Sequence, residues 1–177
     1  MRNRAEVLEF ATLGLLTQNP LHGYELRKRI SAIYGPSKAL SFSMIYPQLR
    51  RLLEGGLIKE GERVTGRRSR IVYTITKAGQ ERFNELTETV SPESWDDDSF
   101  EVRFAFFGEA SKGNRVRILE GRHRRLKEKA EYLRSELERT NTGIDTYLSE
   151  WRRHSLESAE REITWLEELI QSERKSK

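Results

Sequence analysis

The segment SFSMIYPQLRRLLEGGLIKE, residues 41–60, decides how the N-terminal half of the chain folds. Four of its apolar residues recur at helical spacing and predict one core-facing stripe, made of Ile45, Leu49, Leu52 and Leu53. Ser41 and Ser43 can cap the first turn, and Pro47 is tolerated only near the start of a helix. The glycine pair that follows suits the left-handed residue at a helix C-terminus. The segment therefore predicts an amphipathic helix with a polar outer face, starting between residues 41 and 46.

Two more helices are expected before this segment. Residues 5–17 are mostly apolar and predict a buried helix. An Asn-Pro pair ends it, because the residue before a proline avoids the helical conformation. In the next helix Leu26, Ile30 and Ile33 share one face, and a Gly-Pro pair stops it.

The segment after the third helix has the pattern of a β-hairpin. Residues 57–60 and 71–75 have the composition and alternation of short strands. The polar loop between them carries arginines at four positions, Arg63, Arg67, Arg68 and Arg70. Thr76 can cap a fourth helix over residues 77–90. This order of helices and hairpin predicts a winged helix-turn-helix domain over residues 1–90, within a mainly α (α+β) fold.

The second half of the chain predicts a helical dimerisation domain. Residues 91–114 have the composition of a linker followed by a short aromatic segment. Two long helices follow, over residues 115–140 and 144–173, and the first repeats apolar residues in alternating steps of three and four, as coiled coils do. His123 is the polar position in this seam, and its role stays open. We expect residues 115–177 to pair two chains through Leu119, Leu126, Leu133, Leu137, Trp151, Ile163, Leu166 and Ile170.

Charge separates the two halves. The 177 residues carry a net charge of +4, with 34% charged and 36% hydrophobic residues. Residues 1–90 hold 15 Lys and Arg against 9 Asp and Glu, whereas residues 91–177 hold 17 against 19. A basic first half suggests that this half meets a polyanion. The sequence has no apolar run of membrane length, no leader-like start and no cysteine, so we expect a cytoplasmic chain without membrane association, disulfides or thiolate chemistry.

Four motifs stand in order along the first 80 positions: LGLL at 13–16, LHGYEL at 21–26, SFSMIYPQLRRLLEGGLI at 41–58 and VYTITKAG at 72–79. Together they resemble the PadR family, the phenolic-acid-responsive transcriptional regulators, and they are far more specific than a generic winged helix. Residues 91–177 resemble, more loosely, the longer subfamily with a C-terminal α-helical domain. The resemblance implies a homodimeric repressor that binds an inverted-repeat operator in double-stranded DNA and is released by a small-molecule effector.

The candidate DNA-contacting residues lie in two places. A recognition helix reads bases mainly with its N-terminal part, which here offers Lys38, Ser41, Ser43, Tyr46, Gln48 and Arg50. The wing offers Arg67, Arg68 and Arg70, because arginine suits phosphate and the narrow minor groove. The alternatives are that Tyr46 packs under the wing and that the arginines form an ordinary solvated surface.

The sequence assigns no effector site, metal or cofactor. A flat aromatic effector needs aromatic walls, and the second half of the chain is rich in aromatic residues, which could equally be core and interface anchors. No His or Cys stand at metal-ligand spacing. Phosphate-binding glycine loops, a nucleophile elbow and a His–carboxylate set are absent from the sequence, so we expect no enzyme. The rival function is a winged-helix module that binds a protein and has no specific DNA binding.

Overall fold

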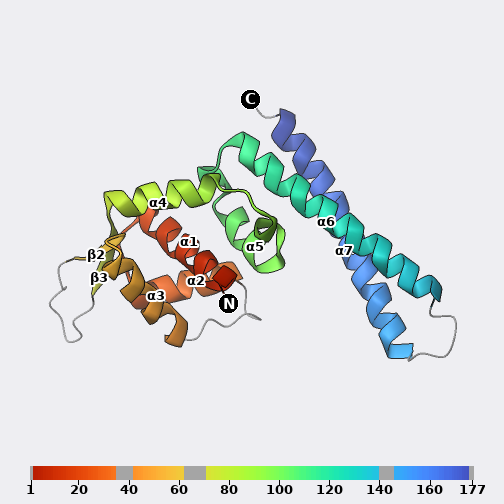
Figure 1. Cartoon of the computed structure of the whole chain (residues 1–177), viewed down its shortest axis with the longest axis horizontal. Coiled ribbons are helices and arrows are strands. Elements are labelled where there is room, and N and C mark those ends of the chain that lie inside the picture. The colour runs from red at the N-terminus through yellow and green to blue at the C-terminus, as the bar shows by residue number, and fades with distance from the viewer. Residues whose placement is uncertain (1, 35–41, 62–70, 140–145, 176–177) are drawn as a thin grey trace. The chain divides into compact units, whose positions relative to one another are not determined.

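The computed structural model, shown in Figure 1, describes the chain except for residue 1 and the segments 35–41, 62–70, 140–145 and 176–177. Two compact units divide the chain, Met1–Ala110 and Ser111–Lys177, and each is described by itself. The fold is mainly α with one small antiparallel sheet, which confirms the predicted fold class.

The N-terminal unit contains five helices and two short 3-10 turns within the described residues. They are α1 (Arg2–Gln18), α2 (Gly23–Tyr34), α3 (Phe42–Glu54), α4 (Lys77–Glu88), η1 (Pro92–Trp95), α5 (Asp97–Ala105) and η2 (Phe107–Glu109). The first four helices correspond to the four that hydrophobic spacing predicts. Thr76 is the N-cap of α4, as expected, and its hydroxyl accepts a hydrogen bond from the amide of Gly79.

Three short strands form the sheet in the order β1-β3-β2, all antiparallel: β1 (Leu21–His22), β2 (Ile58–Glu60) and β3 (Val72–Ile75). β2 and β3 are the predicted hairpin strands. β1 was not predicted, because two residues are too short to show a pattern. It pairs Leu21 with Tyr73 and so joins the start of α2 to the hairpin.

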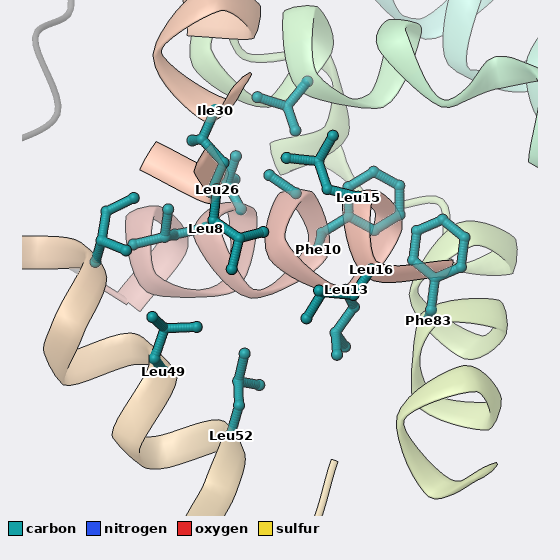
Figure 2. Packing of buried hydrophobic residues seen from close by; sticks show 14 of the residues in the cluster. Leu8, Phe10, Leu13, Leu15, Leu16, Leu26, Ile30, Leu49, Leu52 and Phe83 are labelled. Carbon is teal, nitrogen blue, oxygen red and sulfur yellow. The ribbon is translucent and has the colours of Figure 1, made fainter. Parts of the chain in front are cut away.

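α1 runs through the middle of the hydrophobic core of this unit. Figure 2 shows Leu49 and Leu52 of α3 pointing toward α1 from one side, and Phe83 of α4 approaching it from the other. Leu13 of α1 is fully buried. The stripe that predicts the inner face of α3 is therefore the face that the fold buries, and α3 is held by its apolar side.

Three phenylalanines connect α1, α4 and the end of α5. The ring of Phe10 stacks on Phe83 at 5.2 Å between centroids and meets Phe106 edge-on at 5.5 Å. A Cβ built on Gly14 would lie 2.6 Å from the ring of Phe106, so this ring rests on bare backbone. The segment expected as a linker thus forms η1, α5 and η2, and its residues up to 110 belong to the N-terminal unit.

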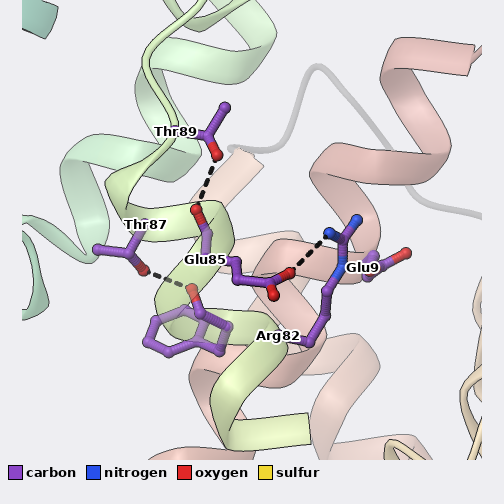
Figure 3. A network of polar contacts seen from close by, with 6 residues as sticks. Glu9, Arg82, Glu85, Thr87 and Thr89 are labelled. Carbon is purple, nitrogen blue, oxygen red and sulfur yellow. Dashed lines mark hydrogen bonds and ion pairs between the residues drawn. The ribbon is translucent and has the colours of Figure 1, made fainter. Parts of the chain in front are cut away.

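Two arginines tie α4 to its neighbours. Nε of Arg82 donates to Glu9 of α1 at 2.9 Å, and Nη1 donates to Glu85 of α4 itself at 3.3 Å; Figure 3 shows these residues. The hydrogen bond with Glu9 is the main cause that raises the pKa of Arg82. Nη1 of Arg103 in α5 donates to the carbonyl of Leu86 at 3.0 Å. Burial lowers the pKa of Arg103, and Glu6 opposes this shift.

The C-terminal unit is a hairpin of two long helices, α6 (Lys112–Arg139) and α7 (Thr146–Lys175), close to the predicted ranges. Ion pairs cross between them antiparallel: Arg115 with Glu173 at 2.9 Å, Arg122 with Glu162 at 2.8 Å, and Arg152 with Glu136 at 2.9 Å. His123, the polar residue of the predicted seam, lies 2.9 Å from a carboxylate oxygen of Glu167. Together with Lys127, it lowers the pKa of Glu167. None of the helices in the described part of the chain is long and apolar enough to cross a membrane.

We predict that Gly79→Ala strongly destabilises the N-terminal unit. A Cβ at this position would collide with the carbonyl oxygen of Leu57, which is backbone and cannot rotate away. We expect the free energy of unfolding to fall by at least about 2 kcal/mol, measured by urea unfolding. Gly113→Ala is the matched control, because a Cβ there meets nothing within 4 Å. Equal stability of the two variants would contradict the close packing at Gly79.

Candidate nucleic-acid interface

The two sides of α3 differ in chemistry and in exposure. Ile45, Leu49 and Leu52 are buried against the core. On the other side the ring of Tyr46 is 49% exposed, and Arg50, one turn further along the helix, is also exposed. The exposed side of α3 therefore carries a phenol hydroxyl and a guanidinium one turn apart, while its apolar side holds the helix on the core. Such a surface suits partners that form hydrogen bonds.

The candidate residues of the recognition helix differ in what the structure says of them. Tyr46 and Arg50 are on the outer face. Gln48 lies on α3 but is only 5% exposed, because it stands three residues after Ile45 and four before Leu52, within the inward stripe. Ser43 belongs to α3, although its side chain is not described, and the remaining candidates lie outside the described residues: Lys38, Ser41, Arg67, Arg68 and Arg70.

The C-terminus of α3 is fixed by a turn at Gly56, whose φ of 67° favours glycine. Its amide donates to the carbonyl of Leu53 at 3.0 Å, and the amide of Leu57 donates to Leu52 at 2.9 Å. Thr76 then closes the hairpin on this turn, since its hydroxyl donates to the carbonyl of Gly56 at 2.7 Å and its amide donates to Leu57 at 3.0 Å. The end of α3 is therefore bonded directly to the residue that follows β3.

The start of α3 is packed against the sheet and α2 around one glycine. A Cβ on Gly23 would lie 3.5 Å from the ring of Tyr46 and 3.6 Å from both Leu49 and Tyr73. Burial, with smaller effects from Glu60 and Tyr46, raises the pKa of Tyr73, so its hydroxyl stays neutral. This contact places the inner edge of Tyr46 on the base of the hairpin while much of its ring stays exposed.

Tyr24 is a candidate that the sequence analysis did not single out. It stands in the first turn of α2, is 58% exposed, and has the guanidinium of Arg27 5.4 Å from its ring centroid. A tyrosine at an exposed helix start is a usual donor to a phosphate oxygen. Its position two residues before Leu26, off the apolar face, is the sequence signal that could have found it.

The candidate dimerisation residues separate into two groups. Five are buried within this single chain, where α6 and α7 pack together: Leu119, Leu126, Leu133, Leu166 and Ile170. Leu137 and Ile163 are half-buried, whereas Trp151 is 66% exposed. Trp165, on the same helix, is 41% exposed. Trp151 and Trp165 are thus two of the large apolar side chains that stay exposed in this unit, together with Tyr132, Tyr147 and Leu148.

The aromatic residues available for an effector also differ in burial. Phe100 and Phe106 are buried in the N-terminal unit, whereas Phe104 is partly exposed between Phe100 and Phe107, with ring centroids 5.8 Å and 5.0 Å away. Among the side chains that the structure describes, no group of three or more His, Cys, Asp or Glu is placed to hold a metal ion.

Comparison with known proteins gives a match over the N-terminal unit. Residues 12–85 match the model of the transcriptional regulator PadR-like family. The negative transcriptional regulator PadR of Bacillus subtilis (strain 168) is 30% identical over 95 residues, which are 49% of this chain and 52% of that protein. The chain therefore spans about half the length of the curated relative it matches.

Two solved structures are similar over different extents. The crystal structure of Bacillus subtilis PadR in complex with operator DNA is 23% identical, with a TM-score of 0.45, and covers 94% of this chain and 99% of that chain. The putative transcriptional regulator TA0346 from Thermoplasma acidophilum is 28% identical, with a TM-score of 0.44, and covers 48% of this chain and 81% of that chain.

Proposed function

We propose that this chain is a sequence-specific DNA-binding repressor of the PadR-like family, because its residues 12–85 match the model of that family of transcriptional regulators. The curated relative over the same region is described as a negative regulator, which supports repression rather than activation. The rest of the proposal follows from the surfaces of the two units.

The exposed face of α3 is the observation that carries the proposal. Tyr46 and Arg50 point away from a helix whose other face is buried, as a recognition helix must present its side chains to base edges. Arginine can bond both acceptors of guanine in the major groove. Gln48 is buried, so we assign base readout to Tyr46 and Arg50 first.

Phosphate contacts then come from the surroundings of α3. Tyr24 at the start of α2 is exposed for this role. In the sequence, Arg67, Arg68 and Arg70 shortly precede β3. We propose that they bind the DNA backbone or the minor groove. Ser41, Ser43 and Lys38 precede the outer face of α3 in the sequence and belong to the same proposed contact surface.

A second copy of the chain is the proposed partner of the C-terminal unit. An inverted-repeat operator has two-fold symmetry and calls for a two-fold symmetric protein, with recognition helices about 34 Å apart or a multiple of this. Trp151 and Trp165 leave large apolar surface on α7, and aromatic residues dominate the binding energy of many interfaces. Pairing through α7 would fix the separation of the two α3 helices.

A small aromatic molecule is the proposed effector. It would release DNA by binding better to a dimer whose recognition helices are spaced wrongly for the operator. The effect cannot exceed the difference in its affinity for the two states of the dimer. We propose no catalytic activity, since the matched family consists of transcriptional regulators. We also propose that the protein acts in the cytoplasm.

We predict that the protein binds the DNA upstream of its own gene more tightly than an unrelated fragment, and that Arg50→Ala reduces this preference. Loss of a bidentate base contact should weaken specific binding by about tenfold and leave binding to unrelated DNA nearly unchanged. Titration of both fragments at two salt concentrations measures the two affinities.

Lys129→Ala removes the same charge from an exposed position of α6 and is the matched control for Arg50→Ala. Affinity that falls equally on both fragments would make Arg50 a phosphate contact. Binding that collapses equally on both fragments for the wild-type protein would contradict the proposed function and favour the rival, a winged helix that docks a protein.

We also predict that Trp151→Ala combined with Trp165→Ala weakens dimerisation. Two interface tryptophans should together lower the association constant by at least about thirtyfold, which analytical ultracentrifugation over a concentration series measures. Tyr132→Ala, which removes another exposed aromatic residue of the same unit, is the control. Unchanged association of the tryptophan variant would place the interface elsewhere.

A further inference from the structure

His22 makes a hydrogen bond that the sheet cannot make with backbone alone. β1 pairs His22 with Val72, and the next antiparallel pair would bring Gly23 opposite Ile71. Gly23, however, already begins α2. In its place Nδ1 of His22 lies 3.2 Å from the carbonyl oxygen of Ile71. The imidazole therefore supplies the donor at the point where the strand runs out.

The chemistry of this contact fixes which nitrogen carries hydrogen. A carbonyl oxygen can only accept, so Nδ1 of His22 must be the donor. In the neutral ring Nε2 is then an acceptor and has no hydrogen to offer to a phosphate. The contact with Ile71 thus uses Nδ1 of His22 within the protein.

Ile71 stands at the loop end of the hairpin strands. β3 follows it at once, and the partner strand on the other side holds the neighbouring residue, since the amide of Gly61 donates to the carbonyl of Val72 at 2.7 Å. Consecutive carbonyls of this strand are therefore bonded from opposite sides, one by β1 through His22 and one by the residue after β2. The start of β3 is therefore held by hydrogen bonds on both sides, an arrangement that we call the hairpin clamp.

The residue that follows His22 lies beside the proposed recognition helix. Gly23, directly after His22, is the glycine around which Tyr46, Leu49 and Tyr73 gather. Two consecutive residues thus serve two neighbours. The imidazole of His22 bonds the hairpin, and Gly23 lies beside the first turns of α3.

We propose that His22 is a positioning residue that sets the hairpin relative to α3, so that both reach one DNA segment together; this rests on the proposed DNA-binding function. It contacts no DNA in this role. It acts through its hydrogen bond to Ile71. Loss of the imidazole should loosen the start of β3 while the helical core stays intact.

Three variants separate positioning from direct contact. The side-chain amide of His22→Asn places an N–H where Nδ1 stands, whereas that of His22→Gln places one where Nε2 stands, and His22→Ala offers neither. For the hairpin clamp we expect affinity for the upstream DNA to fall about three- to tenfold in the alanine and glutamine variants and to stay near wild type in the asparagine variant. Retained affinity in the glutamine variant with loss in the asparagine variant would overturn the proposal in favour of a phosphate contact through Nε2.

Hydrogen exchange of the DNA-free protein tests the clamp independently of function. Amides of residues 71–75 should exchange faster in His22→Ala than in wild type or His22→Asn, whereas amides of α4 serve as an unchanged internal reference. Equal exchange in all variants would overturn the clamp whatever the DNA result. Faster exchange confined to the alanine and glutamine variants, in a protein that failed to prefer its upstream DNA, would support the clamp and refute the proposed function.

Discussion

The hydroxyl of Thr76 is the contact on which the arrangement of α3, the hairpin and α4 depends. It donates to the carbonyl of Gly56 where α3 ends and accepts from the amide of Gly79 where α4 begins. One side chain therefore joins the exit of α3, both ends of the hairpin and the entry of α4. Because Gly79 lies against the carbonyl of Leu57 without room for a Cβ, this junction is tight in backbone as well as in side chain.

Hydrophobic spacing predicted those elements that bury one side. The stripe of α3 is the clearest case, because Ile45, Leu49 and Leu52 are both periodic and buried. The same spacing indicates that Gln48 is buried, as the structure shows, although its amide had suggested contact with a base. β1 carried no such signal, since its two residues become a strand only through pairing with Tyr73 and Val72. α5 was not predicted, because the aspartates at its start and Pro92 before it have the composition of a linker.

The C-terminal unit illustrates what a coiled-coil pattern leaves open. Alternating steps of three and four predict that a helix has a helical partner, and α6 finds that partner in α7 of the same chain. The crossing ion pairs, such as Arg122 with Glu162, make the hairpin antiparallel and fix its register. Some residues that the sequence suggests as contacts between chains, such as Leu126, are buried between α6 and α7 of one chain. The exposed tryptophans of α7 are then the proposed contacts with a second chain.

Phe106, seated on Gly14, closes the N-terminal core from a position well beyond the end of the family match at residue 85. The rings of Phe10 and Phe83 both rely on it, and Arg103 reaches back to α4 from the same segment. A gene fusion that kept only the matched part would leave an aromatic core open to solvent. An exchange of the C-terminal helical unit would therefore have to join the chain at Ala110–Ser111, where the two compact units meet, and not at residue 85, where the family match ends.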